Sequence, residues 1–263
     1  MGIFTKIQKT DDLPSFFMST VPKSGTNYLK QILLGMPNVT HSPLEHEYYV
    51  DYFYLPEFKN LFYRLGHIPS NAFGAGHVYY SPEFSRMLKR LNMKHIFLYR
   101  DLRDVVVSFT YFVIDKYPYH PMYEYLVQLP TQKDRYIAMI KGVDTESFQY
   151  PGIADWIRPF YRWINDPDTF SISFEDIGLS EESRRQVIHK IAEYLWRDLK
   201  PPLSIDEMVE RMEANIDPKR SFTFRSGKIG DWKNEFDEDI KQVFKKTAGH
   251  ILIETGYEKD NDW

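Results

Sequence analysis

The chain has 263 residues, of which 43% are hydrophobic and 27% are charged, a composition typical of a globular protein. Cysteine is absent, which excludes disulfides, thiol catalysis and thiolate metal sites. The formal net charge is −4 and no apolar run is long enough to span a membrane, so we expect a cytoplasmic protein with neither a nucleic-acid nor a membrane partner.

The predicted elements alternate between strands and helices. Short, mostly apolar runs predict buried strands at 15–21 and 95–99, and residues 169–174 are predicted to form a third core strand. Helical patterns follow in chain order at 27–34, 83–92, 104–112, 156–163, 181–196, 205–213 and 237–254. Two aromatic segments with weak periodicity, 41–75 and 115–150, are expected to be loops that form a pocket. The alternation predicts an α/β fold, a P-loop-like, doubly wound parallel sheet flanked by helices, in a single domain over residues 1–263.

The turn between the first strand and the first helix is suited to bind an anion. Gly25 lets the backbone come close to a ligand, where the first N–H groups of the helix and its positive dipole end point. Lys23 adds a mobile charge, and Ser24, Thr26 and Asn27 add side-chain donors. The GxxxxGK[ST] spacing of a Walker A loop is missing, so a magnesium-nucleotide site is not indicated. Taken alone, the segment also fits a plain turn.

Three segments resemble signatures of one enzyme family. Val-Pro-Lys-Ser-Gly-Thr-Asn-Tyr-Leu at 21–29 resembles the 5'-phosphosulfate loop, PKSGTTWL, of sulfotransferases that use 3'-phosphoadenosine-5'-phosphosulfate (PAPS). Tyr-Arg-Asp-Leu-Arg-Asp-Val-Val-Val-Ser-Phe at 99–109 resembles the family's 3'-phosphate segment. Phe-Arg-Ser-Gly-Lys-Ile-Gly-Asp-Trp-Lys at 224–233 resembles its RKGxxGDWK element. The order matches the family, and the resemblance covers about residues 14 to 255.

The resemblance implies that PAPS is the donor, that 3',5'-adenosine bisphosphate (PAP) is a product and that no metal is needed. Arg100 and Ser108 fall on positions that bind the 3'-phosphate, and a forked guanidinium with a nearby hydroxyl suits a dianion. Arg225 and Gly227 would contact the same phosphate, with Ser226 in place of the usual lysine. The alternative for the second segment is a surface ladder of arginine and aspartate side chains that satisfy one another.

The resemblance also assigns catalytic roles. Sulfonate transfer is an in-line displacement in which positioning and charge stabilisation dominate. Lys23 matches the lysine that stabilises the departing phosphate oxygen, and Ser108 matches the serine that restrains it. His77 matches the histidine that acts as general base, a role that suits histidine because its ordinary pKa is near neutrality. Ala75 stands where the animal cytosolic enzymes have lysine, which removes one positive charge from the transition-state site.

Aromatic residues indicate where the adenine and the acceptor would lie. Tyr28 and Phe174 stand where the family stacks the adenine ring, although both positions also fit the core. The two aromatic segments would surround a small-molecule acceptor with a hydroxyl or amine group. They supply Tyr48, Tyr49, Tyr52, Phe53, Tyr54, Tyr117, Tyr119, His120 and Tyr123. Such a wall suits an aromatic, lipid-like or heterocyclic acceptor better than an acidic polysaccharide.

Two other functions stay open at this point. A P-loop small-molecule or nucleotide kinase would need magnesium ligands and a GK[ST] loop. A catalytically silent, sulfotransferase-like binding module is favoured only by Ala75. The family's dimer motif, KxxxTVxxxE, is not reproduced after the third segment, so the oligomeric state is open.

Overall fold

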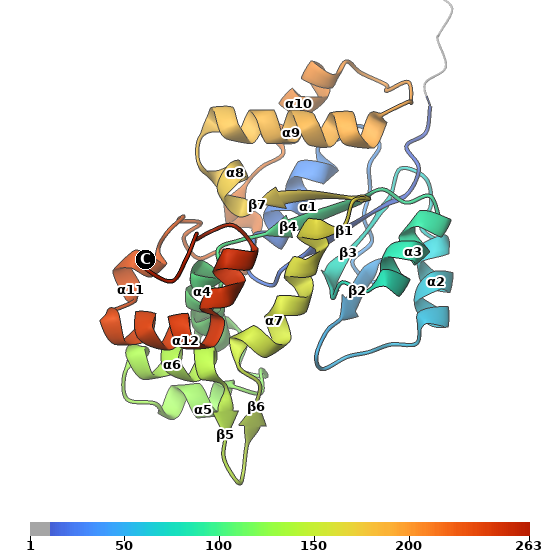
Figure 1. Ribbon diagram of the computed structural model, residues 1–263. Coiled ribbons are helices and arrows are strands. Elements are labelled where there is room, and N and C mark those ends of the chain that lie inside the picture. Colours follow the sequence, from blue (N-terminus) through green and yellow to red (C-terminus); the bar gives the residue numbers. More distant parts are fainter. Residues whose placement is uncertain (1–10) are drawn as a thin grey trace, which may run out of the picture.

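Five parallel strands form the central sheet of the computed structural model, which describes residues 11–263 (Figure 1). Their order is β2-β3-β1-β4-β7, so β1 lies in the middle between β3 and β4. The strands are β1 (Phe16–Thr20), β2 (Glu47–Val50), β3 (Phe73–Val78), β4 (His95–Tyr99) and β7 (Thr169–Ser173). Residues 1–10, where the predicted domain begins, lie outside the described residues.

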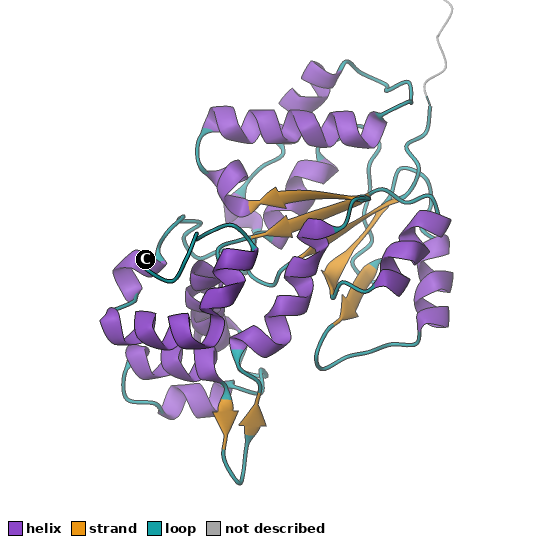
Figure 2. Cartoon of the chain, in the orientation of Figure 1, coloured by secondary structure: helices purple, strands orange, loops and turns teal. Residues whose placement is uncertain are grey.

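Helices account for most of the remaining elements (Figure 2). The α-helices are α1 (Thr26–Leu34), α2 (Phe58–Gly66), α3 (Pro82–Arg90), α4 (Leu102–Lys116), α5 (Tyr123–Gln128), α6 (Gln132–Lys141), α7 (Ile153–Tyr161), α8 (Phe174–Gly178), α9 (Glu181–Trp196), α10 (Ile205–Ala214), α11 (Trp232–Glu235) and α12 (Glu238–Glu254). Two 3₁₀ turns, η1 (Arg162–Asn165) and η2 (Pro218–Arg220), and a small hairpin of β5 (Val143–Asp144) and β6 (Gln149–Tyr150) complete the chain.

The sheet is buried on both faces, because its strands alternate between two hydrophobic clusters. In β1, Phe17 packs with residues of α2, α3, α4 and α7, whereas Phe16 and Met18 pack with residues of α1, α9 and α10. Figure 1 shows α1, α9 and α10 on one side of the sheet and α4, α7 and α12 on the other. Helices on both faces of a parallel sheet are the doubly wound arrangement, so the predicted fold class is confirmed.

One predicted boundary moves by one residue for a local reason. Ser173 ends β7, and its hydroxyl accepts a hydrogen bond from the Asp176 N–H while the Asp176 carboxylate accepts one from the Ser173 N–H. This capping box starts α8 directly after the strand. Phe174, expected as the last residue of the strand, is therefore the first residue of α8.

The expectation of loops at 41–75 and 115–150 holds only in part, because both segments also contain helices and strands. The first segment contains β2, α2 and the start of β3, and the second contains α5, α6 and the hairpin. The β3 sequence Phe-Gly-Ala-Gly-His-Val lacks the β-branched pattern of a strand. Its small residues are required by packing, because a Cβ on Gly76 would lie 1.7 Å from the backbone oxygen of Tyr48 in β2.

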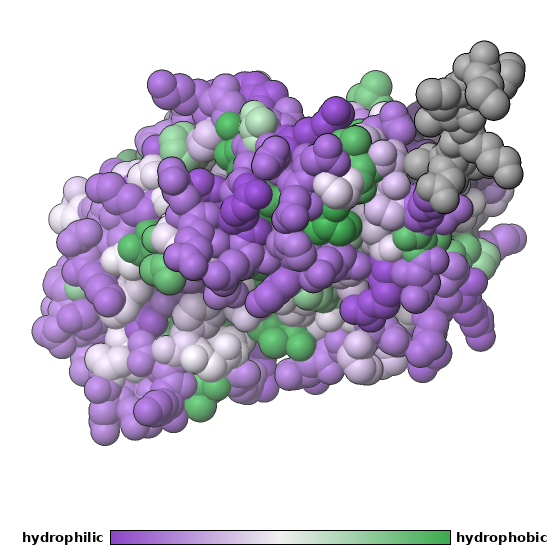
Figure 3. Space-filling view, turned by 90° about the horizontal axis from the view of Figure 1, so that it is seen from above, coloured by the Kyte–Doolittle hydropathy of each residue, from purple (hydrophilic) through white to green (hydrophobic). Residues whose placement is uncertain are grey.

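The face viewed from above α9 and α10 is mainly hydrophilic, with hydrophobic residues in small separate groups (Figure 3). None of the helices in the described part of the chain combines the length and the apolar character needed to cross a membrane.

Candidate active site

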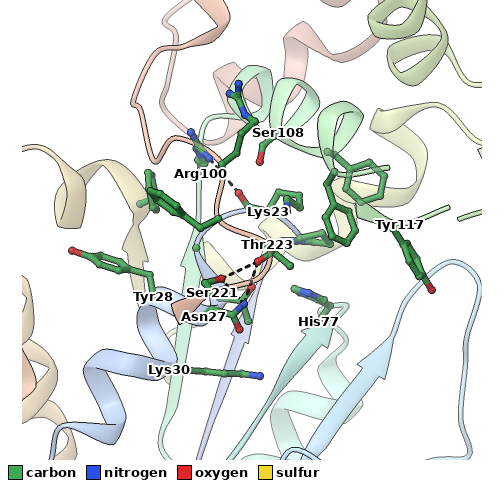
Figure 4. A pocket seen from close by; sticks show the side chains of 18 of the residues that line it. Lys23, Asn27, Tyr28, Lys30, His77, Arg100, Ser108, Tyr117, Ser221 and Thr223 are labelled. Carbon is green, nitrogen blue, oxygen red and sulfur yellow. Dashed lines mark hydrogen bonds between the residues drawn. The ribbon is translucent and has the colours of Figure 1, made fainter. Parts of the chain in front are cut away.

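A cavity of about 890 Å³ opens at the carboxyl ends of the strands. It lies at β1, where the strand order changes direction: β3 is on one side of β1 and β4 is on the other. It brings together all but one of the residues predicted to bind the donor or to catalyse the transfer. They are Lys23, Gly25, Thr26, Asn27, Tyr28, His77, Arg100, Ser108, Phe174, Arg225, Ser226 and Gly227. Figure 4 shows ten of the lining side chains by name, with Lys23 in the middle, Tyr28 on one side and His77 on the other.

The exception is Ser24, whose expected role as a side-chain donor to the ligand is not supported by the geometry. Its buried hydroxyl donates to the backbone oxygens of Val21, at 2.6 Å, and of Leu98, at 3.1 Å. These bonds fix the turn after β1 against the end of β4. The neighbouring Lys23 and Gly25 both have positive φ, 67° and 100°, so Ser24 stabilises a backbone conformation that aims the start of α1 at the cavity.

Three cationic side chains, Lys23, Arg100 and Arg225, gather at one end of the cavity, here called the cationic end. Burial, together with the charges of Arg100 and Arg225, lowers the pKa of Lys23 to about 8. The Lys23 Nζ lies 4.0 Å from the centre of the Phe112 ring. The positive charges of these three side chains repel one another, so a multiply charged anion bound among them would stabilise the cationic end.

Arg100 is nearly buried and is held from several sides. Its guanidinium donates to the backbone oxygens of Lys23, at 3.3 Å, and Lys228, at 2.6 Å, and it pairs with Asp104. Its plane lies 4.5 Å from the centre of the Phe174 ring. The Nε–H is also buried and has no hydrogen-bond partner among the described residues. An orphaned buried donor on a fixed guanidinium fits an anionic oxygen atom.

The C-terminal segment that carries Arg225 is tied to α4 by Asp104. The two carboxylate oxygens of Asp104 accept hydrogen bonds from the N–H groups of Gly230, at 2.8 Å, and Trp232, at 3.0 Å. Arg225 pairs with Asp231, and its guanidinium lies 4.7 Å from the centre of the Tyr111 ring. The surface-ladder alternative holds only in part, because Asp104 pairs with Arg100 but also anchors the segment that lines the cavity.

Residues before Arg225 are joined to α1. The Asn27 amide donates to the hydroxyl oxygens of Ser221, at 2.9 Å, and Thr223, at 3.1 Å (Figure 4). The Thr26 hydroxyl shares a hydrogen bond of 2.7 Å with that of Thr20. The polar side chains at the start of α1 therefore hold neighbouring elements, and the helix N–H groups are left to face the cavity.

His77 lies in β3 next to β1, with one ring nitrogen engaged. Its Nδ1 is 2.9 Å from the backbone oxygen of Thr20, which can only accept, so Nδ1 carries the proton. Nε2 is then the unprotonated nitrogen, and no described residue bonds to it. Burial lowers the pKa of His77 below its ordinary value, so the ring is neutral at pH 7. A neutral histidine with a free Nε2 on the cavity wall is a competent general base.

The aromatic part of the cavity wall, here called the aromatic end, combines residues from both aromatic segments. Four of the predicted wall residues line the cavity: Tyr49, Phe53, Tyr117 and His120. Tyr48 is fully buried below it, Tyr119 is 88% exposed, and neither they nor Tyr52, Tyr54 and Tyr123 line it. The wall also contains aromatic residues that the sequence did not single out: Phe109, Phe112, Tyr150, Trp156 and Phe160.

Other residues in or next to the site were also missed. Thr20, which orients His77, precedes the predicted turn and has no motif of its own. Lys30 and Glu47 form an ion pair that joins α1 to β2, and His41 bonds to the same carboxylate at 3.0 Å. Among residues 11–263, no group of three or more histidine, aspartate or glutamate side chains is placed to hold a metal ion.

Comparison with known proteins supports one family. The family model described as the sulfotransferase domain matches residues 13–256. Sulfotransferase 1E1 of Rattus norvegicus is 27% identical over 59% of this chain and 53% of its own length, and the Mus musculus protein is 26% identical over 58% and 52%. The chain thus spans about half the length of these two relatives. Flavonol 4'-sulfotransferase of Flaveria chlorifolia is 22% identical over 91% of this chain and 79% of its own length.

Solved structures agree on the fold. Mouse sulfotransferase SULT7A1 complexed with PAP has a TM-score of 0.61 at 21% identity, covering 94% of this chain and 88% of its own. Retinol dehydratase in complex with androsterone and PAP has a TM-score of 0.58 at 19% identity, covering 93% and 82%. The predicted resemblance is confirmed, because the family model spans nearly all of the described residues: the chain belongs to the sulfotransferase domain family.

Proposed function

We propose that this protein is an enzyme that transfers a sulfonate group from PAPS to a hydroxyl, or an amine, of a small-molecule acceptor. The observation that carries the proposal is the cationic end of the cavity, where Lys23, Arg100 and Arg225 lie together with the N-terminus of α1. The structures of relatives in complex with PAP are consistent with a donor that has phosphates at both ends of its ribose.

The two phosphate groups of PAPS would be held by different elements. The 5'-phosphosulfate would lie on the turn of Lys23 and Gly25, at the N–H groups of α1. The 3'-phosphate would lie between Arg100, Ser108 and Arg225, where the buried Nε–H of Arg100 has no protein partner. The adenine would stack near Tyr28 and Phe174, whose ring centroids are 6.5 Å apart at an interplanar angle of 62°. Ser226 and Gly227 line this part of the cavity.

The transfer itself needs one base and one cationic group. The Nε2 of His77 takes the proton of the acceptor hydroxyl as its oxygen forms a bond to sulfur. The bond between sulfur and the bridging phosphate oxygen breaks, and its electron pair stays on PAP. The Lys23 ammonium stabilises the charge that develops on that oxygen, with Ser108 beside it on α4. Ala75 is buried, does not line the cavity and carries no charge, so Lys23 supplies the positive charge at the reacting atoms in this mechanism.

The acceptor would lie at the aromatic end, in contact with His77. Its wall of Phe53, Tyr117, Tyr150, Trp156 and Phe160 matches a small, largely apolar molecule. Rings on such a wall bind flat acceptors through edge and face contacts.

The test is an assay of radiolabelled sulfonate transfer from PAPS to a panel of phenols, alcohols and amines. We expect transfer by the wild type, and a loss of about 10²- to 10⁴-fold in kcat for His77→Ala, because one positioned base is removed. PAP affinity should be unchanged in this variant, which shows that it is folded. His67→Ala is the matched control, since His67 lies on the surface at the end of α2. Transfer that survives His77→Ala unchanged would contradict the proposed mechanism.

A further inference from the structure

One carboxylate at the aromatic end has no place in the proposed transfer. Asp51 follows β2 and lines the cavity with Tyr49 and Phe53. Its Oδ1 accepts hydrogen bonds from the N–H groups of Phe53, at 2.8 Å, and Tyr54, at 3.0 Å. Among residues 11–263, no lysine, arginine or histidine forms an ion pair with it. The turn bonds orient the carboxylate but leave its negative charge without a cationic partner.

The other acidic residue of the cavity wall is different in this respect. Glu47, on the same strand, is bound by Lys30 and by His41, so its charge is balanced within the protein. The nearby histidines do not balance Asp51 either, because burial lowers the pKa of both His77 and His120, the latter to about 4. Both rings are therefore neutral at pH 7. A single unbalanced negative charge is left at the aromatic end.

Aromatic side chains line the cavity together with Asp51, among them Phe53, Tyr150 and Phe160. Phe53 stacks on Tyr150 at a centroid distance of 5.3 Å, and Tyr79 packs edge-on against Phe160 at 4.5 Å. Phe53 links the carboxylate to these rings, because its N–H donates to Asp51 while its ring stacks on Tyr150. Burial raises the pKa of Tyr150, and the negative charge of Asp51 raises it further. Rings around a carboxylate form a site for an organic ammonium ion, which gains from the charge and from the ring faces together.

We propose that Asp51 is a specificity residue that selects acceptors with a protonated amine at the end remote from the reacting hydroxyl. The inference rests on the proposed function, because it takes the aromatic end as the acceptor site. The hydroxyl would lie at His77 and the ammonium between Asp51, Phe53 and Tyr150. An aryl-alkylamine with a phenolic hydroxyl has this chemistry, and an anionic acceptor of the same size would be repelled.

The test uses three phenols of similar shape and different charge: tyramine, 4-ethylphenol and 3-(4-hydroxyphenyl)propionate. Their binding to the complex of the protein with PAP is measured by calorimetry at neutral pH. We expect tyramine to bind about 10- to 30-fold more tightly than 4-ethylphenol, and the propionate to bind most weakly. Asp51→Asn should remove the preference for tyramine and leave the affinity for 4-ethylphenol unchanged. The asparagine oxygen can still accept both turn hydrogen bonds, so the variant should fold.

Glu57→Gln is the matched control, because it removes a carboxylate from the same loop. The Glu57 side chain does not line the cavity and makes no capping hydrogen bond to α2. It should keep the preference for tyramine. Binding of PAP is measured first, and failure at that step overturns the proposed function and the inference with it. If PAP binds but tyramine and 4-ethylphenol bind equally, if neither binds, or if Asp51→Asn keeps the preference, the inference alone is overturned.

Discussion

The protonation of His77 follows from where its two ring nitrogens point. Nδ1 donates to the backbone of Thr20, and burial lowers the pKa of the ring below 6.5, its ordinary value. The neutral, active form of a base with a lowered pKa is present above that pKa and is lost as the pH falls through it. We therefore predict that the acid limb of kcat/KM lies below pH 6.5.

A pH profile of sulfonate transfer between about pH 4.5 and pH 8 measures this limb. The His67→Ala variant should show the same profile as the wild type, because His67 does not line the cavity. An acid limb above 6.5 would mean that His77 is stabilised in its charged form, and would contradict its assignment as a base of lowered pKa.

Lys23 shows the opposite dependence, because its charged form is the useful one. Its pKa is lowered to about 8 by burial and by the two arginines, and a bound dianion favours the ammonium. Binding of PAP should then raise the pKa of Lys23, take up a proton near pH 8 or above, and weaken as the pH rises. We predict a fall in affinity of about 10-fold between about pH 7.5 and pH 9.5.

Calorimetry in buffers of different ionisation enthalpy measures both the affinity and the proton uptake. Lys23→Met removes this titrating group, so its weaker binding of PAP should lose most of the pH dependence. A wild-type affinity that is constant over this range would show that Lys23 does not face the donor phosphate.

At the scale of elements, α4 and the C-terminal segment depend on each other through Asp104. This buried carboxylate pairs with Arg100 and accepts from the N–H groups of Gly230 and Trp232. Asp104→Ala would leave a nearly buried guanidinium without its counter-ion and two loop N–H groups without their acceptor. We predict a loss of about 3–5 kcal/mol in the free energy of unfolding, together with weaker binding of PAP.

Denaturant unfolding with and without PAP measures both effects. Asp115→Ala, on the exposed part of the same helix, is the control and should change the free energy of unfolding by no more than about 0.5 kcal/mol. Equal stability of Asp104→Ala and the wild type would show that the segment carrying Arg225 is held by other contacts.

The sequence predicted well the elements whose residue pattern reflects core packing or helix capping alone. Strands β1 and β4 are short, mostly apolar runs, and β7 alternates between polar and apolar residues. Helices α9 and α12 are long and begin after capping residues, Ser180 and Asp237. Strand β3 was missed because its glycines serve packing against β2. Strand β2 was missed because Tyr48 packs in the core whereas its neighbour Tyr49 lines the cavity, so both faces carry aromatic residues and the periodicity is blurred.

At the scale of the whole molecule, the cavity unites residues that are far apart in the chain. The turn at Lys23, the end of β4 at Arg100 and the segment at Arg225 were predictable because each belongs to a segment that resembles a family signature. Thr20 and Asp51 were not, because their positions depend on which strands are neighbours. That order cannot be obtained from local patterns, since β1 pairs with β3 and β4 rather than with β2.

The proposed function differs from that of a nucleotide kinase in its donor, which carries a phosphate on the 3' position of the ribose. Calorimetric titration with PAP, adenosine 5'-monophosphate and ATP with magnesium measures that difference most directly. Because Arg100, Ser108 and Arg225 line one cavity with Lys23, we predict that PAP binds without magnesium. Removal of the 3'-phosphate should weaken binding by about 100-fold or more. Equal affinity for the two adenosine phosphates, or binding of ATP with magnesium alone, would contradict the assignment of the cationic end as the PAPS site.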